Sequence, residues 1–374
     1  MNEPAQISLP DLQLRKKNTV QVLTGCKEAK PLDDGYSLRY PANAAWQKKL
    51  GTFAATWGKS APQMTFEITE ESSSGSYWLT IRGPEGTKLF VEGARHMLMS
   101  DITPPDTLQF RARHAVRYAT SPLRVLPNYL IIGAKKCGTT ALYSYLTQHP
   151  AIAPALKKEI NFFDALYSMG RGWYRSFFPT VFERSRIEKA TGQPFMTGEA
   201  TPDYLFDSDS IARIHETVPN IRMLAILRNP IDRAYSHYNH NLRAGLESLS
   251  FAEAMEAEQE RLSEGSELHF FHKTNLGYAQ RSTYIDQLEE WAKVFDKSQF
   301  CVLKSEDLYE FPERTLTRAF EFLGLNYVAP REFKKLNTAP YAEMDPEVRA
   351  RFVAKFQPDN ERLYEFLGED FNWS

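Results

Sequence analysis

Residues 128–150 read NYLIIGAKKCGTTALYSYLTQHP, and this stretch decides the fold. The apolar run Tyr129–Ile132 predicts a buried strand, and the apolar residues within 142–146 recur at helical spacing. Between them, Gly133 and Gly138 bound a short loop. A strand, a glycine-bearing loop and a helix in this order point backbone N–H groups and a helix N-terminus at an anion. The sequence therefore predicts a phosphate-binding loop.

The loop keeps the two glycines of a Walker A motif but moves its lysine. In that motif a lysine follows the second glycine and reaches the β- and γ-phosphates of a nucleotide. Here Thr139 follows the second glycine, and Lys136 comes two residues before it. The hydroxyl groups of Thr139 and Thr140 add donors. We therefore expect a phosphate, but in a loop that differs from that of an ATPase.

A second predicted strand, IRMLAILR at 221–228, ends in a cation where magnesium-dependent P-loop enzymes have a carboxylate. Arg228 repels a metal ion and can bind a second anion through two parallel hydrogen bonds. Asn229-Pro230 then starts a helix, and Ser236 on that helix can grip the same anion. Two anion sites without a metal carboxylate suit a nucleotide that is phosphorylated at two positions. We expect no bound metal.

The composition excludes several classes of protein. The 374 residues carry a formal net charge of −2, which argues against nucleic acid as a partner. Cys26, Cys137 and Cys301 are too few and too far apart for a disulfide framework or a zinc site, so reduced thiols are expected. The first residues lack the apolar core of a secretory signal, and no run of about 18 apolar residues occurs. We therefore expect a cytoplasmic protein without a transmembrane segment.

Patterns along the chain predict two domains. In residues 1–120, apolar and polar residues alternate in two segments, QMTFEITEE and SYWLTIRG, with the turn cluster SSSGS between them. They also alternate over 108–112, within TLQFRARHAVRYA. We expect a small β-rich accessory domain there. From 121 to 374, buried strands, including one at 299–308, alternate with amphipathic helices. That alternation predicts an α/β fold with a central parallel sheet covered on both faces, in a P-loop-like three-layer arrangement.

Four segments in order give this chain a specific resemblance to a known family. They are GAKKCGTTAL at 133–142, KEINFFD at 158–164, LRNPIDRAYSHY at 227–238 and EFLGEDFNW at 365–373. Together they resemble the sulfotransferases that use 3′-phosphoadenosine 5′-phosphosulfate (PAPS) as donor. The resemblance is closest to the branch that contains heparan sulfate N- and O-sulfotransferases and bacterial relatives, and it covers roughly residues 126–374.

The resemblance implies transfer of a sulfuryl group from PAPS to an acceptor hydroxyl, with no metal. It places the 5′-phosphosulfate on the loop and the 3′-phosphate on Arg228 and Ser236. Lys136 is expected to bridge the leaving oxygen and the transferred group, and GYAQRSTY at 277–284 is expected to touch the nucleotide. The implied cofactor-binding residues are Lys135, Lys136, Cys137, Gly138, Thr139, Thr140, Arg228, Ser236, Ser282 and Tyr284.

Glu159 falls where the family has a glutamate, and the resemblance assigns it as the general base. From the local sequence alone, a surface glutamate among lysines is the simpler interpretation. Lys157 and Lys158 favour its ionised form. Toward the acceptor we expect Lys158, Glu199 and Trp173. Glu199 can instead orient basic side chains, and Trp173 can equally belong to the core.

Two departures from the family concern the acceptor. Many carbohydrate O-sulfotransferases have a lysine after the glutamate of TGEATPDYLF, where this chain has Ala200. The paired-cysteine loop of the heparan enzymes is also missing, and FKKLNTAPYAEMDP, with Lys334 and Lys335, stands near that place. The acceptor is therefore expected to be a carbohydrate or another small metabolite, and a heparan-like chain is in doubt.

Two other functions fit parts of the pattern. A P-loop kinase of small substrates is disfavoured by Thr139 after the second glycine and by Arg228 in the metal position. A nucleotide-binding module without activity is disfavoured because the set of candidate residues is complete. His149, His237 and His240 are interpreted as structural side chains rather than as a base.

Overall fold

A computed structural model describes residues 18, 22–23, 25–60, 63–71, 73, 75–84, 87, 91, 108–243, 246–262, 276–333 and 342–373. The described part divides into two compact units. The first draws on Met1–Thr103, Asn241–Ser248 and Ala257–Leu276, and the second on Pro104–His240, Leu249–Glu256 and Gly277–Ser374. Lys334 and Lys335 lie outside the described residues. The domain limits 1–120 and 121–374 stay a prediction.

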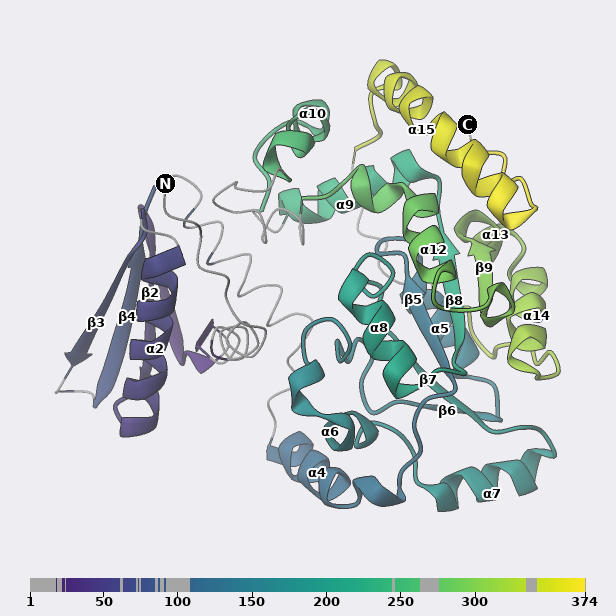
Figure 1. Cartoon of the computed structure of the whole chain (residues 1–374), viewed down its shortest axis with the longest axis horizontal. Helices are drawn as coiled ribbons and strands as arrows, with labels where there is room; N and C mark the ends of the chain where they lie inside the picture. Colours follow the sequence, from purple (N-terminus) through teal and green to yellow (C-terminus); the bar gives the residue numbers. More distant parts are fainter. Residues whose placement is uncertain are drawn as a thin grey trace. The chain divides into compact units, whose positions relative to one another are not determined.

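The first unit contains a four-stranded antiparallel sheet in the order β1-β2-β4-β3. The predicted hairpin is confirmed, because Phe66 pairs with Ile81 and Ile68 pairs with Leu79 across β3 and β4. Helix α2 lies along this sheet (Figure 1), and its Phe53 meets Phe66 edge-on with ring centroids 5.9 Å apart. The elements are β1 (Glu28–Leu32), β2 (Gly35–Pro41), α2 (Ala44–Ser60), β3 (Thr65–Glu71) and β4 (Ser76–Arg82).

The second unit is built on a five-stranded parallel sheet in the order β6-β7-β5-β8-β9. The predicted α/β class is therefore confirmed. Figure 1 shows the strands at the centre of this unit with helices around them. Because the strands run in one direction, their carboxyl ends meet at a single edge of the sheet. The strands are β5 (Tyr129–Gly133), β6 (Ile152–Pro154), β7 (Met196–Ala200), β8 (Arg222–Leu227) and β9 (Phe300–Lys304).

Helices connect and cover these strands, with α5 against β5 and β7 and α14 against β9. Among the described residues, none of the helices combines the length and apolar character needed to cross a membrane. The α-helices are α4 (Leu108–Ala119), α5 (Thr139–Leu146), α6 (Arg171–Arg175), α7 (Val181–Thr191), α8 (Ser208–Thr217), α9 (Pro230–Arg243), α10 (Phe251–Arg261), α12 (Tyr284–Ala292), α13 (Ser305–Glu310), α14 (Pro312–Leu323) and α15 (Pro346–Leu367). Short 3₁₀ helices are η1 (Ser121–Leu123), η2 (Tyr167–Met169), η3 (Gln280–Ser282) and η4 (Lys297–Gln299).

The strand predicted from the alternation over 108–112 is wrong, because this segment begins helix α4. Leu108–Ala119 is rich in Leu, Gln, Arg and Ala and contains neither glycine nor proline. Summed over a dozen residues, such helix propensities outweigh an alternation of three apolar positions. Arg117 then anchors the helix by donating to the carbonyls of Ser176 (2.6 Å) and Phe178 (2.8 Å).

The strand predicted over 299–308 is correct only in its first half. β9 ends at Lys304, and Ser305–Glu310 forms helix α13. Glu306 and Asp307 fall in the first turn of that helix, where negative side chains are stabilising because the helix N-terminus carries partial positive charge. The change from strand to helix coincides with the change from apolar to acidic residues.

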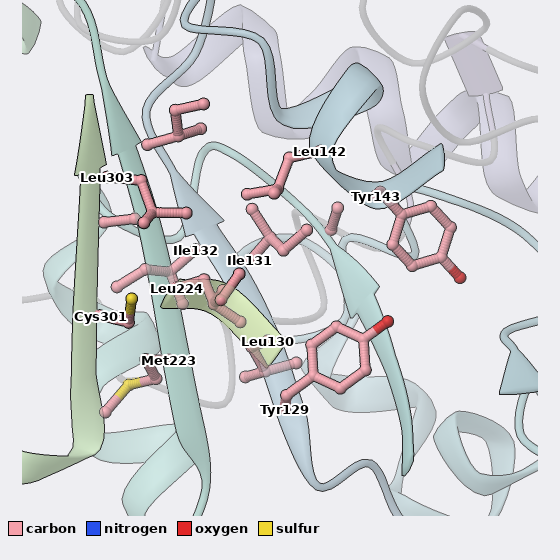
Figure 2. Packing of buried hydrophobic residues seen from close by; sticks show 14 of the residues in the cluster. Tyr129, Leu130, Ile131, Ile132, Leu142, Tyr143, Met223, Leu224, Cys301 and Leu303 are labelled. Carbon is pink, nitrogen blue, oxygen red and sulfur yellow. The ribbon is translucent and has the colours of Figure 1, made fainter. Parts of the chain in front are cut away.

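The core of the second unit surrounds β5. Residues 129–132 of this strand are fully buried. Burying side chains of this size contributes about 1.5–3 kcal/mol each. The strand that leads into the predicted phosphate loop is thus held firmly on both sides. Figure 2 shows Tyr129, Leu130, Ile131 and Ile132 of β5 with Met223 and Leu224 of β8, Cys301 and Leu303 of β9, and Leu142 and Tyr143 of α5.

We predict that Gly198→Ala, in the middle of β7, destabilises the protein by about 1–3 kcal/mol or more. A Cβ atom at this position would lie 2.3 Å from the carbonyl oxygen of Tyr129, which belongs to the paired strand and cannot swing away. Gly172→Ala is the control, because its Cβ would meet nothing closer than 3.5 Å. Urea unfolding measures both variants. Equal stability of the two would contradict the close approach of β5 and β7.

Candidate active site

The predicted phosphate loop follows β5 at the carboxyl edge of the sheet. Lys136 and Gly138 have φ angles of 71° and 98°, and α5 begins directly afterwards. No side chain caps this helix, and Leu142 donates to the Gly138 carbonyl at 3.0 Å. The N–H groups of the first helical turn have no acceptor within a helix, so they are available to an anion. A Cβ atom on Gly138 would lie 3.0 Å from the Tyr309 hydroxyl, in a backbone conformation that favours glycine.

Lys135 of the loop belongs to a cluster of charges. Its Nζ lies 3.4 Å from Asp203 Oδ2, and Arg281 Nη1 lies 2.7 Å from Asp203 Oδ1. The guanidinium of Arg281 also lies over the ring of Phe206, 4.2 Å from its centroid. Burial by itself would raise the pKa of the Asp203 carboxyl, but Lys135 and Arg281 lower it to about 2. Asp203 therefore stays ionised and holds two cations beside the loop.

Arg228, the candidate for the 3′-phosphate, is joined to the loop through one tyrosine. Tyr284 Oη donates to the Arg228 carbonyl at 2.9 Å and lies 3.5 Å from Cys137 Sγ. Burial raises the pKa of the Cys137 thiol, while the hydrogen bond with Tyr284 and the charges of Arg233 and Arg228 act against this rise. Ser236 lies on the helix that follows Arg228 and is 8% exposed. The hydroxyl of Tyr284 thus contacts one residue of each predicted phosphate site, Cys137 and Arg228.

The start of α9, next to Arg228, is fixed by Glu306 of α13, which in turn contacts Trp373 near the end of the chain. Asn229 Oδ1 accepts from the Ile231 N–H at 3.1 Å, and Glu306 Oε1 accepts from the Asn229 N–H at 2.8 Å. Glu306 Oε2 accepts from Trp373 Nε1 at 3.3 Å. The segment EFLGEDFNW is thereby connected to the residue that follows Arg228.

Ser282, predicted to touch the nucleotide, lies behind this site. Its buried Oγ accepts from Arg233 Nε at 2.7 Å and lies 3.0 Å from the Pro230 carbonyl and 2.9 Å from that of Tyr278. Arg233 is fully buried and also donates to the Tyr278 carbonyl at 2.6 Å. These bonds tie η3 to α9. A nucleotide contact from Ser282 stays a prediction, and its partners within the protein favour a structural role.

Glu159, the candidate base, lies in a loop beside the end of β7. Its side chain is 26% exposed and forms an ion pair with Lys158. Its backbone has a φ angle of 56°, and its N–H donates to the Ala200 carbonyl at 3.1 Å. The carboxylate is accessible to a ligand. Lys158, which was expected to face the acceptor, already contacts Glu159.

Glu199 and Trp173, also expected near the acceptor, are packed into the protein. Glu199 is fully buried in β7. Burial raises the pKa of its carboxyl group, and hydrogen bonds from four neighbouring groups oppose that rise. Trp173 packs against Phe177 and Phe162, with ring centroids 4.6 and 6.2 Å apart. The structure favours the core interpretation of Trp173, and it leaves Glu199 no exposed surface for an acceptor.

Comparisons with known proteins identify the family of this chain. A family model described as "Sulfotransferase domain" matches residues 126–344. The chain belongs to the sulfotransferase family. It is therefore a sulfotransferase enzyme, and the family resemblance seen in the sequence is confirmed.

Several sulfotransferases are similar to this one over much of their length. A membrane-associated sulfotransferase, kil1, of Dictyostelium discoideum is 27% identical over 67% of this chain and 67% of its own. Heparan sulfate glucosamine 3-O-sulfotransferase 6 of Mus musculus is 29% identical over 72% of this chain and 80% of its own. The crystal structure of a sulfotransferase from Alicyclobacillus acidocaldarius is similar with a TM-score of 0.51 and 30% identity, and the match covers 66% of this chain and 98% of that one. This structural likeness supports the P-loop-like fold.

The sequence patterns missed three residues that lie around the predicted phosphate loop: Asp203, Arg281 and Tyr309. Asp203 and Arg281 lie within TGEATPDYLF and GYAQRSTY, but they are 78 residues apart, and nothing local marks them as a pair. Asp203 comes shortly after a strand of a parallel sheet, at the edge where ligands bind, and that position was the available signal. Among the described residues, no group of three or more His, Cys, Asp or Glu side chains is arranged to hold a metal ion.

We predict that Asp203→Asn destabilises this sulfotransferase by about 1–3 kcal/mol at pH 7. The folded-state pKa of about 2 is below the ordinary value of 3.8, so the stabilisation is present above about pH 4 and is lost as the pH falls toward 2. The difference in the free energy of unfolding between wild type and variant should therefore shrink between pH 5 and pH 2.

Urea unfolding at a series of pH values measures this difference. Asp209→Asn is the control, because Asp209 pairs with Arg213 within one exposed helical turn and should contribute less. A difference for Asp203→Asn that does not change with pH would contradict the assigned charge cluster.

Proposed function

We propose that this sulfotransferase takes its sulfuryl group from PAPS and transfers it to an acceptor hydroxyl, with Glu159 as general base. The observation that carries the proposal is the contact of Tyr284 Oη with both predicted phosphate sites, through Cys137 Sγ and the Arg228 carbonyl. One site suits a 5′-linked group and the other a 3′-phosphate. PAPS is a nucleotide with both.

The groups in these sites fit the two anionic ends of PAPS. The uncapped first turn of α5 offers backbone N–H donors, with the hydroxyls of Thr139 and Thr140 at the same position. Lys136 adds a positive charge from the loop itself. Arg228 and Ser236 would hold the 3′-phosphate, which a guanidinium binds through two hydrogen bonds. When bound, PAPS supplies an activated sulfuryl group on a phosphate that serves as leaving group.

Within this proposal, the protein's own residues position the acceptor and move its proton. The accessible carboxylate of Glu159 takes the proton of the acceptor hydroxyl as the oxygen attacks, and such general-base catalysis contributes about 10²–10⁴-fold. Lys158 forms an ion pair with this carboxylate and so places a positive charge beside it. Lys136 stabilises negative charge on the leaving phosphate, which is the role that positioned cations have in related group transfers.

The acceptor class is proposed from the relatives and from Ala200. Several relatives are named as heparan sulfate glucosamine 3-O-sulfotransferases, which supports a hydroxyl on a carbohydrate. Ala200, fully buried at the end of β7, supplies no charge for a polyanionic chain. We therefore favour an uncharged carbohydrate or another small hydroxyl compound over heparan sulfate. A labelled-sulfate transfer assay with heparan sulfate, an uncharged oligosaccharide and 4-nitrophenol distinguishes these classes.

A cytoplasmic location stays a proposal from the sequence.

We predict that Glu159→Gln lowers the rate of sulfate transfer about 10²–10⁴-fold while binding of adenosine 3′,5′-bisphosphate is unchanged. The amide cannot accept the acceptor's proton, but it keeps the size of the side chain. Glu188→Gln is the control, because it also removes the carboxylate of an ion pair, with Arg184 on α7. If Glu159→Gln were as active as Glu188→Gln, the base would lie elsewhere.

We predict that Arg228→Ala weakens binding of adenosine 3′,5′-bisphosphate by about 10- to 100-fold and leaves binding of adenosine 5′-monophosphate nearly unchanged. Only the first nucleotide has a 3′-phosphate for the guanidinium. Arg222→Ala, at the opposite end of β8, is the control, since Arg222 donates to the Leu323 carbonyl. Isothermal titration calorimetry measures the four affinities. Equal losses for both nucleotides in Arg228→Ala would show that the 3′-phosphate binds elsewhere.

A further inference from the structure

Five consecutive backbone N–H groups, those of residues 159–163, donate to a single segment, residues 199–204. Buried N–H groups need acceptors, and this loop lies outside the helices and strands that would supply them. One acceptor is a backbone carbonyl and the others are side chains. The bonds run from Glu159 to the Ala200 carbonyl (3.1 Å), from Ile160 to Glu199 Oε2 (3.4 Å), from Asn161 to Thr201 Oγ1 (3.3 Å), and from Phe162 and Phe163 to Tyr204 Oη (3.0 and 3.4 Å).

Glu199 determines that Thr201 and Tyr204 act as acceptors toward this loop. Thr201 Oγ1 donates to Glu199 Oε2 at 2.6 Å, and Tyr204 Oη donates to Glu199 Oε1 at 2.7 Å. A hydroxyl group has one proton, so a hydroxyl that gives it to the carboxylate turns its lone pairs to other donors. All three side chains are fully buried.

The carboxylate of Glu199 is fully occupied by uncharged donors. Besides Thr201 and Tyr204, it accepts from the Ile160 N–H at 3.4 Å and from Tyr174 Oη at 3.3 Å. Four donors directed at two oxygens match the lone pairs of a carboxylate. In a Gln side chain, an NH₂ group would replace one of the two oxygens. It would face either the two tyrosine hydroxyls or the Thr201 hydroxyl and the Ile160 N–H. An NH₂ group donates and does not accept, so the hydrogen bonds on that side would be lost.

The loop needs this support because its backbone is strained. Glu159 and Asn161 have φ angles of 56° and 55°, in the left-handed region. Residues with a side chain rarely adopt this conformation; Asn does so more readily than most, and Glu does not. A loop released from its acceptors would relax to ordinary φ values, and a change of φ at Glu159 redirects the Glu159 side chain itself.

We propose that Glu199 is a positioning residue whose buried carboxylate, through Thr201 and Tyr204, holds the 159–163 loop so that Glu159 faces the acceptor. This inference rests on the proposed role of Glu159 as general base. It replaces the sequence-based expectation that Glu199 contacts the acceptor.

A matched pair of tyrosine variants tests the proposal. Tyr204→Phe and Tyr174→Phe each remove one buried hydroxyl that bonds to the same oxygen, Glu199 Oε1. Only Tyr204 also accepts from the loop. With PAPS and the acceptor that reacts fastest in the panel above, we expect Tyr204→Phe to lower kcat by about 10²-fold, the scale of a misplaced catalytic group. Tyr174→Phe should lower it far less, and neither should change the affinity for adenosine 3′,5′-bisphosphate.

The second test asks whether Glu199 acts through Glu159. Glu199→Gln alone should lower kcat by about 10²-fold, with nucleotide affinity and the KM for PAPS unchanged. Combined with Glu159→Gln, it should cost little more than Glu159→Gln does alone, because residues that act through one group are not additive. If Glu199 only stabilised the fold, the losses in kcat of the two single variants would multiply in the double variant. Tyr204→Phe provides the test if Glu199→Gln does not fold.

The outcomes separate this inference from the proposed function. An active Glu159→Gln would overturn the base and its positioning together. If Glu159→Gln is inactive, either of two results would overturn the role of Glu199 alone. One is an equal loss of kcat in the two tyrosine variants. The other is a double variant slowed by the product of the single effects. A large loss confined to Tyr204→Phe and a non-additive double variant support the proposal.

Discussion

The parallel pairing of β5 with β7 on one side and β8 on the other is the constraint on which the site depends. Because the three strands run in one direction, whatever follows their carboxyl ends is brought to one edge of the sheet. Lys135 follows β5, Asp203 follows β7 and Arg228 follows β8. These residues are scattered over about a quarter of the sequence. A reversal of one strand would separate them, so the topology matters more to the chemistry than any single contact does.

Much of this arrangement could be predicted from the sequence because it is written in local patterns. The apolar runs identified β5 and β8, Pro230 identified the start of α9, and the two glycines identified the loop between β5 and α5. The misassigned segments are those where a pattern is short. In 108–112 the helix propensity of a dozen residues outweighed the alternation of three apolar positions. After Lys304, an acidic helical turn ended β9 earlier than expected.

The roles of buried polar residues could not be predicted, because hydrogen bonds between distant segments leave no local signal. Glu199 resembles a ligand-binding residue in a linear motif, yet its contacts are with Ile160, Tyr174, Thr201 and Tyr204 inside the protein. The contacts of Asp203 also leave no local signal, because Lys135 lies 68 residues before it and Arg281 lies 78 residues after it. The net charge of −2 gives no sign of this local cluster, because it is a sum over the whole chain.

The position of Cys137 has a consequence for chemical modification. Thiol reagents attack the thiolate, and a buried sulfur with a raised pKa rarely presents one. Cys137 is 1% exposed and Cys301 6% exposed, and burial raises the pKa of both thiols, that of Cys301 to about 11. Of the three cysteines in the sequence, only Cys26 is partly exposed. A maleimide dye would therefore attach to Cys26, which belongs to the first unit, and would leave the thiol of Cys137 in the 133–138 loop unmodified.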